Sequence, residues 1–452
     1  MVIDKPVRLA DGLHVRELPS GWTICINPKF ATWFRIDRPG RELLDLVDGK
    51  RSILKIAEDT AQSYGIGLSH VEADVRDFFT AACDRQIVVC EGEREEDHKP
   101  VRHELHRLFL RYNARRSDAG AVAEMAPAVA AAAVRGLPET VRVIFRVSPG
   151  DVSFGNLRAA LAAAGSGRTK YLHLDSRMVS PELVGAVKDL VAVWELSGDG
   201  SGSEAIESLR SALETLSKEG VKQMHVSVAA APDTDISGLY RLASDFKCQK
   251  LTVENAAAED GRESVPRGRA RGDFIRSWDE LFQEYTALCV SLPMTMRAGR
   301  TQVDCEGINY RTLFLSGVSY ANCGLGTGTR SIDVDGSVYP CPHLHLPEHR
   351  TGNVMVDDPE TVERRLSDAY ARLAANCSEC SSCELRGFCD RGCRAAAYAA
   401  CGDIEAKDPA CESIKRTMWK ILEKWAIVKM EPDTAETSVP RAERPVAASG
   451  PP

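Results

Sequence analysis

The chain has 452 residues, a formal net charge of −8 and 44% hydrophobic residues, as expected for a globular protein of two or three domains. The negative charge argues against a nucleic-acid binder or an anionic-membrane binder, because both need an excess of Lys and Arg. No run approaches 18 apolar residues and "MVIDKPVRLADGLHV" lacks the apolar core of a signal peptide, so we expect a cytosolic protein with no membrane partner.

Residues 1–92 have the pattern of a small domain. "WTICINP" and "TWFRIDR" alternate apolar and polar side chains as half-buried strands do, and helical patterns follow in "RELLDLVDG", "SILKIAEDTAQSYG" and "VEADVRDFFTAACDRQ". Gly49 and Gly65 are the expected helix stops. The charged run "EGEREEDHKP" is typical of a linker.

Residues 104–300 alternate strand-like and helical segments, which predicts βαβ units and a parallel sheet in an α/β fold. The strand-like runs are "VRVIFRVS", "KYLHLDS", "VAVWELS", "VKQMHVSVAA" and "KLTVEN". A Gly/Arg-rich insertion, "EDGRESVPRGRARGD", interrupts the alternation. Residues 432–452 have the composition of a disordered tail.

Residues 305–425 are rich in cysteine: nine of the 15 cysteines lie between Cys323 and Cys411. A reducing cytosol keeps thiols free, so this clustering indicates metal rather than disulfides. Structural zinc is one interpretation, because C-x2-C with two further cysteines is also a zinc signature.

The order and spacing of seven cysteines, together with the phrase "IDVDGSVYPCPHL", resemble the SPASM domain, the auxiliary-cluster extension of peptide-modifying radical SAM enzymes. In that family the phrase forms a hairpin, with Asp335-Gly336 as its turn here. The resemblance implies two 4Fe–4S clusters of auxiliary type. One would be held by Cys380, Cys383, Cys389 and Cys411, and the other by Cys323, Cys341 and Cys393.

The chain departs from that family near Cys323, because the preceding "LFLSGVSYAN" lacks the further cysteine of members with a fully ligated first cluster. Either that cluster has an open iron, or Cys305 reaches it. Cys377 and Cys401 lie off the pattern and are interpreted as non-ligands.

The middle region resembles the partial (β/α)6 barrel of radical SAM enzymes in architecture alone. These enzymes carry C-x3-C-x2-C after the first barrel strand. We assign "VRVIFRVS" as that strand, and the "PGDVSFGNLRAALAAAG" that follows has no cysteine. We therefore expect a degenerate barrel and no bound S-adenosylmethionine. A ligand set such as Asp151 and Asp175 is an alternative, although loop and helix-cap roles suit these residues better.

The order of strands and helices in residues 1–92 resembles the PqqD-like RiPP recognition element, a small winged-helix-like domain. Such domains bind the leader of a ribosomal precursor peptide as an added strand. The expected docking strand is "TWFRIDR", with the helix around Val75, Phe78 and Phe79 beside it. A DNA-binding winged helix is the alternative, but this block holds 12 Lys/Arg against 14 Asp/Glu.

Other candidate residues have structural explanations. His343 and His345 could be ligands beside Cys341, but loop histidines more often lie on the surface or behind a ligand. Trp194 and Glu195 are expected in the core and in a pocket lining, and no nucleophile–base pair is specific enough to name.

Three functions remain open from the sequence. The preferred one is an iron–sulfur helper protein of ribosomal-peptide maturation, which binds a leader peptide and assists a partner, such as an intact radical SAM protein. The second is an active maturase with a non-standard cluster site, and the third is a zinc-stabilised peptide-binding protein. Whether the chain is itself an enzyme, which peptide it binds and how it oligomerises are not specified by the sequence.

Overall fold

The computed structural model describes residues 4–90, 105–115, 122–199, 203–230, 235–255, 301–305, 325, 328–375, 380–389, 392–409 and 411–427. The expected linker at 91–100, the Gly/Arg-rich insertion at 259–273 and the tail at 432–452 lie outside these ranges.

The N-terminal domain combines two small antiparallel sheets with three helices. Its elements are β1 (Val7–Leu9), β2 (His14–Glu17), β3 (Thr23–Asn27), β4 (Thr32–Ile36), α1 (Arg38–Asp45), α2 (Ile53–Tyr64), α3 (Leu68–Asp84) and β5 (Val88–Cys90). β1 pairs with β5, and the other sheet has the order β2-β3-β4. Asp37 and Ser52 cap α1 and α2 through their side chains. Gly65 ends α2 with φ of 65°, the left-handed conformation expected of a glycine stop.

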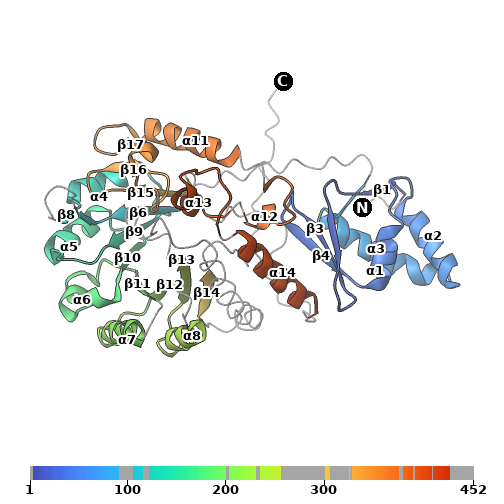
Figure 1. Cartoon of the computed structure of the whole chain (residues 1–452), viewed down its shortest axis with the longest axis horizontal. Coiled ribbons are helices and arrows are strands. Elements are labelled where there is room, and N and C mark those ends of the chain that lie inside the picture. Colours follow the sequence, from blue (N-terminus) through green and yellow to red (C-terminus); the bar gives the residue numbers. More distant parts are fainter. Residues whose placement is uncertain are drawn as a thin grey trace, which may run out of the picture.

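A parallel sheet forms the middle of the chain and carries helices on its outer side (Figure 1). Its strands are β6 (Arg107–Arg111), β9 (Arg142–Val147), β10 (Lys170–Asp175), β11 (Val193–Asp199), β12 (Met224–Ala230), β13 (Lys250–Asn255) and β14 (Gln302–Cys305). The other elements are β7 (Asn113–Arg115), β8 (Val122–Glu124), α4 (Pro127–Ala133), α5 (Phe154–Ala163), α6 (Pro181–Val187), α7 (Ser203–Lys218) and α8 (Ile236–Asp245). The expected βαβ alternation is therefore confirmed.

The first strand of this sheet differs from our expectation. β6 lies parallel to β9 and precedes it in the chain, so "VRVIFRVS" is the second parallel strand. The pattern that predicts β6 is weak, because "RLFLR" is short and follows a charged segment. The segment after the true first strand is 112–126, and it has no cysteine either.

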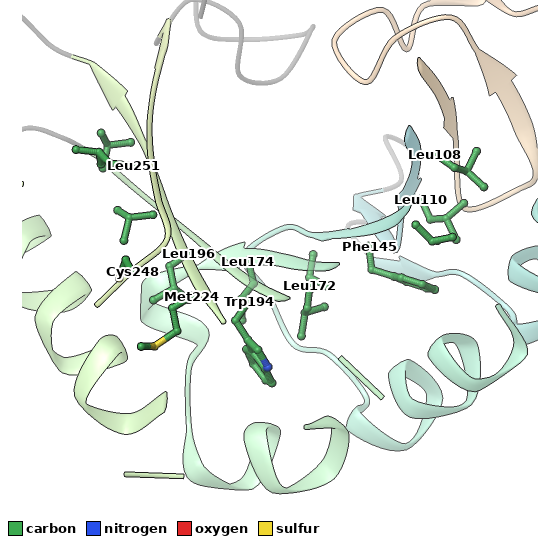
Figure 2. Packing of buried hydrophobic residues seen from close by; sticks show 14 of the residues in the cluster. Leu108, Leu110, Phe145, Leu172, Leu174, Trp194, Leu196, Met224, Cys248 and Leu251 are labelled. Atoms are coloured by element: carbon green, nitrogen blue, oxygen red, sulfur yellow. The ribbon is translucent and has the colours of Figure 1, made fainter. Parts of the chain in front are cut away.

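Alternation along the parallel strands directs their apolar side chains to the helices. Leu172, Leu174, Trp194 and Leu196 are at most 1% exposed, and Figure 2 shows Trp194 pointing toward the helices. Burying such side chains contributes about 1.5–3 kcal/mol each relative to exposure. The alternate positions on the same strands face the other side of the sheet.

The C-terminal part continues the same ten-stranded sheet, because β15 (Thr329–Ile332) pairs in parallel with β6. β16 (Ser337–Tyr339) and β17 (Gly352–Asn353) follow in antiparallel order. The β15–β16 hairpin turns at Gly336, with φ of 85°, as the Asp-Gly pair predicts. The helices are α11 (Pro359–Ala375), α12 (Arg386–Cys389), α13 (Arg394–Cys401) and α14 (Cys411–Ile427). Of the helices in the described ranges, none combines the length and apolar character that crossing a membrane requires.

Strand β3 is buried on both faces. Cys25 belongs to the core formed with the N-terminal helices, whereas Ile24 and Ile26 share a buried cluster with Phe388 and Leu422 of α12 and α14. Figure 1 likewise shows α14 between the parallel sheet and strands β3 and β4. The N-terminal domain and the cysteine-rich segment are therefore packed together through an apolar interface.

Polar contacts and one close backbone approach reinforce this interface. The Arg16 guanidinium lies 4.3 Å from the centroid of the Trp419 ring, and Arg35 Nη1 donates to the Ala426 carbonyl at 2.8 Å. Gly387 of α12 abuts the turn between β3 and β4. A Cβ at this glycine would collide with the Pro28 carbonyl oxygen and lie 3.1 Å from Ala31 Cα.

We predict that Gly387→Val destabilises the protein by about 1–3 kcal/mol, because the added side chain meets backbone that cannot rotate away. Urea unfolding measures this change. Gly155→Ala in α5 is the control, since a Cβ there meets nothing within 4 Å and a helical alanine is favourable. Equal stability of Gly387→Val and wild type would show that the described contact is not tight.

Candidate functional site

Four of the predicted ligands line one cavity. Cys380 and Cys383 lie in the turn before α12, Cys389 is the last residue of α12, and Cys411 is the first residue of α14. They surround a cavity of about 140 Å³ together with Ser382 and charged side chains. The backbone N–H of Cys383 donates to the Cys380 carbonyl at 3.2 Å, which closes the turn. Thus the spacing Cys-x2-Cys-x5-Cys places these residues around one cavity together with Cys411, which is distant in the sequence.

The charged side chains around this cavity are paired with one another. Lys415 Nζ lies 3.0 Å from Glu384 Oε2, and Lys407 Nζ lies 2.6 Å from Glu412 Oε1. Burial raises the pKa of the Cys411 thiol to about 11 and raises that of Cys389 as well. The negative charges of neighbouring thiolates act in the same direction, so these groups lie close enough to interact. As free thiols they are protonated at neutral pH, and metal binding would release their protons.

Cys341 and Cys393 form a separate group. Cys341 follows β16, and Cys393 caps α13, with its sulfur accepting from Ala396 N at 3.5 Å. Both pack with the apolar side chains of Leu325 and Leu344. Cys323, the third predicted member, lies outside the described residues, although Leu325 two positions later belongs to this group.

Asp408 connects the two groups of cysteines. It is 5% exposed, its Oδ2 accepts from Cys393 N at 2.6 Å, and its carbonyl accepts from Cys411 N at 2.9 Å. Sequence analysis did not single out this residue. Its place in "DPAC", three residues before a predicted ligand, was the available signal.

The remaining cysteines of this region take other positions. Cys401 is exposed on α13, and its thiol donates to the Ala397 carbonyl at 3.1 Å. The backbone of Cys305 ends β14, and its side chain is outside the described set, as is all of Cys377. Within the described ranges, no three His, Cys, Asp or Glu side chains converge closely enough to hold a single metal ion.

His345 makes contacts that sequence analysis missed. Its Nε2 lies 2.7 Å from Ser331 Oγ, its Nδ1 lies 3.4 Å from Asp333 Oδ2, and its ring stacks on Tyr339 at 4.4 Å. The order Ser–His–Asp matches that of a hydrolase triad. Ser331 is only 1% exposed, however, so a substrate carbonyl has no access. The arrangement therefore fixes the loop that begins at Cys341.

A row of ionisable side chains crosses the inner face of the parallel sheet. We call it the ionisable row: Arg146, His173, Glu195, His225 and Lys250, which are consecutive partners in the register of β9 to β13. His173 Nδ1 lies 3.7 Å from Glu195 Oε2, and their side chains are 10% and 18% exposed. Parallel sheets usually bury apolar residues on both faces, so this polar face is a candidate binding surface. The core position expected for Trp194 is confirmed, whereas the pocket-lining role expected for Glu195 stays a prediction.

The electrostatics of Glu195 reflect its neighbours. Burial by itself raises the pKa of this carboxyl, but the adjacent His173 and the charges of Lys250 and His225 outweigh burial and lower the pKa to about 2. Glu195 is therefore ionised at neutral pH. An ionised carboxylate beside an imidazole holds that ring in one orientation.

The two segments after β6 and β9 are held by protein hydrogen bonds. Asn113 Nδ2 donates to the Ser148 carbonyl at 2.8 Å, and its Oδ1 accepts from Ser148 N at 2.7 Å. Glu124 Oε1 accepts from Ser153 N at 2.6 Å. Asp151 lies exposed in this loop, while Asp175 caps the turn at Arg177, 2.9 Å from its backbone N. The cap role expected for Asp175 is confirmed.

The expected docking strand is an edge strand. Among the described strands, β4 pairs with β3 alone, and α3 runs beside it on the face opposite α14. The rings of Phe34 and Phe78 lie 5.7 Å apart, and Phe78 contacts Phe79 at 5.1 Å. This edge and the aromatic wall beside it are what addition of a peptide strand requires.

We predict that Glu195→Gln lowers the stability at pH 7 by about 1–3 kcal/mol, because it removes the charge that faces His173 and Lys250. The folded-state pKa lies below the usual value of 4.5, so this contribution is present above pH 4.5 and is lost as the pH falls toward 2. Urea unfolding at pH 7, 5 and 3.5 should show the free energies of unfolding of Glu195→Gln and wild type converging as the pH falls. Glu207→Gln, at an exposed position, is the control. A stability difference between Glu195→Gln and wild type that does not depend on pH would contradict the lowered pKa of Glu195.

Comparison with known proteins identifies the N-terminal region. Residues 24–88 match the sequence model of the family "Coenzyme PQQ synthesis protein D (PqqD)". A curated but uncharacterized protein from Archaeoglobus fulgidus is 28% identical over 102 residues. That match spans 22% of this chain and 24% of the relative, so the chain matches about a quarter of the length of that protein.

Solved structures share the fold of the larger part. The protein anSMEcpe, solved with bound AdoMet, superposes with a TM-score of 0.53 at 15% identity, covering 72% of this chain and 98% of that one. SuiB from Streptococcus suis superposes with a TM-score of 0.47 at 14% identity, covering 89% of this chain and 98% of SuiB. At these identities the anSMEcpe likeness shows the fold alone. The chain thus joins a PqqD-like N-terminal domain to a larger part that shares the fold of anSMEcpe.

Proposed function

We propose that this chain is an iron–sulfur protein of ribosomal-peptide maturation that docks a precursor leader peptide and assists a partner maturase in the cytosol. The observation that carries the proposal is the position of β4. This strand is an edge strand in a region that matches PqqD, and its sheet packs against the segment that holds the predicted cluster ligands.

Peptide docking is supported by the shape of the β4 edge. An added strand of six to eight residues would gain several backbone hydrogen bonds of about 1 kcal/mol net each, with apolar anchors against Phe34 and Phe78. After the cost of ordering the peptide, the affinity is of roughly micromolar order. The charge of −2 in residues 1–92 favours a peptide over DNA.

Two 4Fe–4S clusters are the proposed cofactors, and the donor set fits them. Four cysteines line a cavity of about 140 Å³, and four cysteine thiolates are the ligand set that one 4Fe–4S cluster takes. Cys380, Cys383, Cys389 and Cys411 would hold one cluster, and Cys341 and Cys393 with Cys323 the other. Such clusters supply one-electron transfer. Asp408, Lys407 and Lys415 are the polar groups of this chain closest to that chemistry.

The partner is proposed to supply radical chemistry. No cysteine follows β6 or β9 in 112–126 or 148–153, and hydrogen bonds from Asn113 and Glu124 hold these segments. A partner with its own C-x3-C-x2-C motif would cleave S-adenosylmethionine, while this chain presents the peptide.

The ionisable row favours a second candidate, an enzyme that acts on the inner face of the sheet. His173 beside ionised Glu195 is the arrangement of an oriented general base. Assay of the pure protein with S-adenosylmethionine and strong reductant distinguishes the candidates. Steady formation of 5′-deoxyadenosine supports the enzyme, and its absence supports the helper.

For the clusters, we predict that Cys389→Ala lowers bound iron and acid-labile sulfide by about half in anaerobic preparations, because one of two clusters loses a ligand. Cys341→Ala should remove the other half. Cys401→Ala is the matched control and should leave both contents unchanged, since this thiol lies exposed on α13. Stoichiometric zinc without sulfide would contradict the proposal and support the zinc-stabilised alternative.

For docking, we predict that Phe78→Ala weakens leader binding about tenfold, because it removes the aromatic wall beside β4. The probe is the labelled N-terminal half of the peptide from a candidate precursor reading frame near the gene, and fluorescence anisotropy gives the affinity. Tyr64→Ala is the control, an exposed aromatic on α2. Proline at Phe34 or Arg35 should abolish binding where the lost N–H faces the peptide.

The full chain is needed for this test, because Ile24 and Ile26 would be exposed in an isolated 1–92 fragment. Equal losses of affinity for the leader peptide in Phe78→Ala and Tyr64→Ala would contradict docking at β4.

A further inference from the structure

The two ends of β4 lie at different distances from the cysteine cavity. At the start of the strand, the turn Pro28–Ala31 abuts Gly387, and the cavity-lining residues Arg386 and Cys389 lie on either side of that glycine. The start of β4 is therefore its end near the cavity.

The other end of β4 is held at the far end of α14. Arg35 Nη1 donates to the Ala426 carbonyl at 2.8 Å, whereas the cavity residue Cys411 begins that helix. Fifteen residues separate Cys411 from Ala426, which corresponds to about 22 Å along a helix. Helix α14 and strand β4 thus run in the same direction, and the end of β4 at Ile36 is far from the cavity.

This geometry gives a docked peptide a direction. The leader of a precursor precedes the segment to be modified, so that segment lies toward the peptide's C-terminus. A strand antiparallel to β4 ends beside Thr32, whereas a parallel strand ends beside Ile36. Both existing pairings in this sheet are antiparallel, and the antiparallel ladder is slightly the more stable.

We propose that a precursor docked on β4 presents the residues that follow its leader to the rim of the cavity lined by Cys380, Cys383, Cys389 and Cys411. This inference rests on the proposed function and adds the surface that receives the modified segment. At about 3.3 Å per extended residue, four residues beyond the docked strand span about 13 Å. The rim is then within reach of the first few residues of that segment.

The rim has the composition of a peptide-receiving surface. Ser382 is exposed there, and Glu384, Arg386 and Lys415 supply charges of both signs to the lining. Trp419 joins this rim to the N-terminal sheet, because its Nε1 donates to Glu384 Oε1 at 3.1 Å while Arg16 of β2 covers its ring. Cys341 and Cys393 pack instead in the separate cluster with Leu325 and Leu344.

Site-specific photocrosslinking on the full chain tests the direction. p-Benzoylphenylalanine is incorporated in place of Ser382 at the rim, of Arg38 just beyond the far end of β4, or of Val356, which is 85% exposed on the loop after β17. The probe is the complete peptide from a candidate precursor reading frame near the gene, and mass spectrometry maps the cross-linked residues. Affinity is measured separately by anisotropy with each variant.

We expect position 382 to cross-link at least tenfold more often to precursor residues after the segment docked on β4 than to residues before it. Position 38 should show the opposite preference, and position 356 should give none. Reversed preferences, or cross-links from 38 with none from 382 in a variant that binds normally, would overturn the inference and leave leader docking intact. If neither the wild type nor any variant binds the precursor, the proposed function itself is overturned.

Discussion

The burial of β3 on both faces is the constraint on which the rest of this structure depends. Cys25 packs into the N-terminal helices, and its neighbours Ile24 and Ile26 pack against the helices that carry Cys389 and Cys411. One strand therefore joins two cores, and the edge of β4 and the cysteine cavity keep a fixed relation. A peptide-binding domain on a flexible tether would give no such relation. The proposed presentation of the peptide follows from this packing.

The parallel sheet contributes a frame rather than cluster ligands. Its outer face is apolar and covered by helices, while its inner face carries the ionisable row. The segments after β6 and β9 contain no cysteine, and side-chain amides and carboxylates hold them instead. The larger part shares the fold of anSMEcpe, and the cavity lined by four cysteines lies in the C-terminal segment.

Local signals in the sequence predicted the local structure. The helix stop at Gly65, the hairpin at Gly336 and the βαβ alternation all depend on residues a few positions apart. Cys380, Cys383 and Cys389 line one cavity, and their ligation of a single cluster stays a prediction. Strand β6 was missed because it is short and follows a charged segment, so the assignment of the first parallel strand was wrong.

Long-range contacts could not be predicted in this way. Arg35 and Ala426 are 391 positions apart, and neither residue carries a pattern that points to the other. Ser331 and His345 are 14 apart, and their pairing depends on the turn of the β15–β16 hairpin. Asp408 bonds both cysteine groups through one carboxylate oxygen and one carbonyl, a role that any loop aspartate could take. Such contacts follow from tertiary packing, which a single sequence does not encode in any short motif.

Hydrogen–deuterium exchange on the anaerobically purified full chain tests the central claim, that one continuous surface receives the peptide, most directly. The leader half of the precursor should slow exchange in β4 and α3 alone, because it pairs with the strand edge. The complete precursor should additionally slow exchange in 380–389 and at the start of α14. Protection by the complete precursor that is confined to β4 and α3, or that lies elsewhere, would contradict the account.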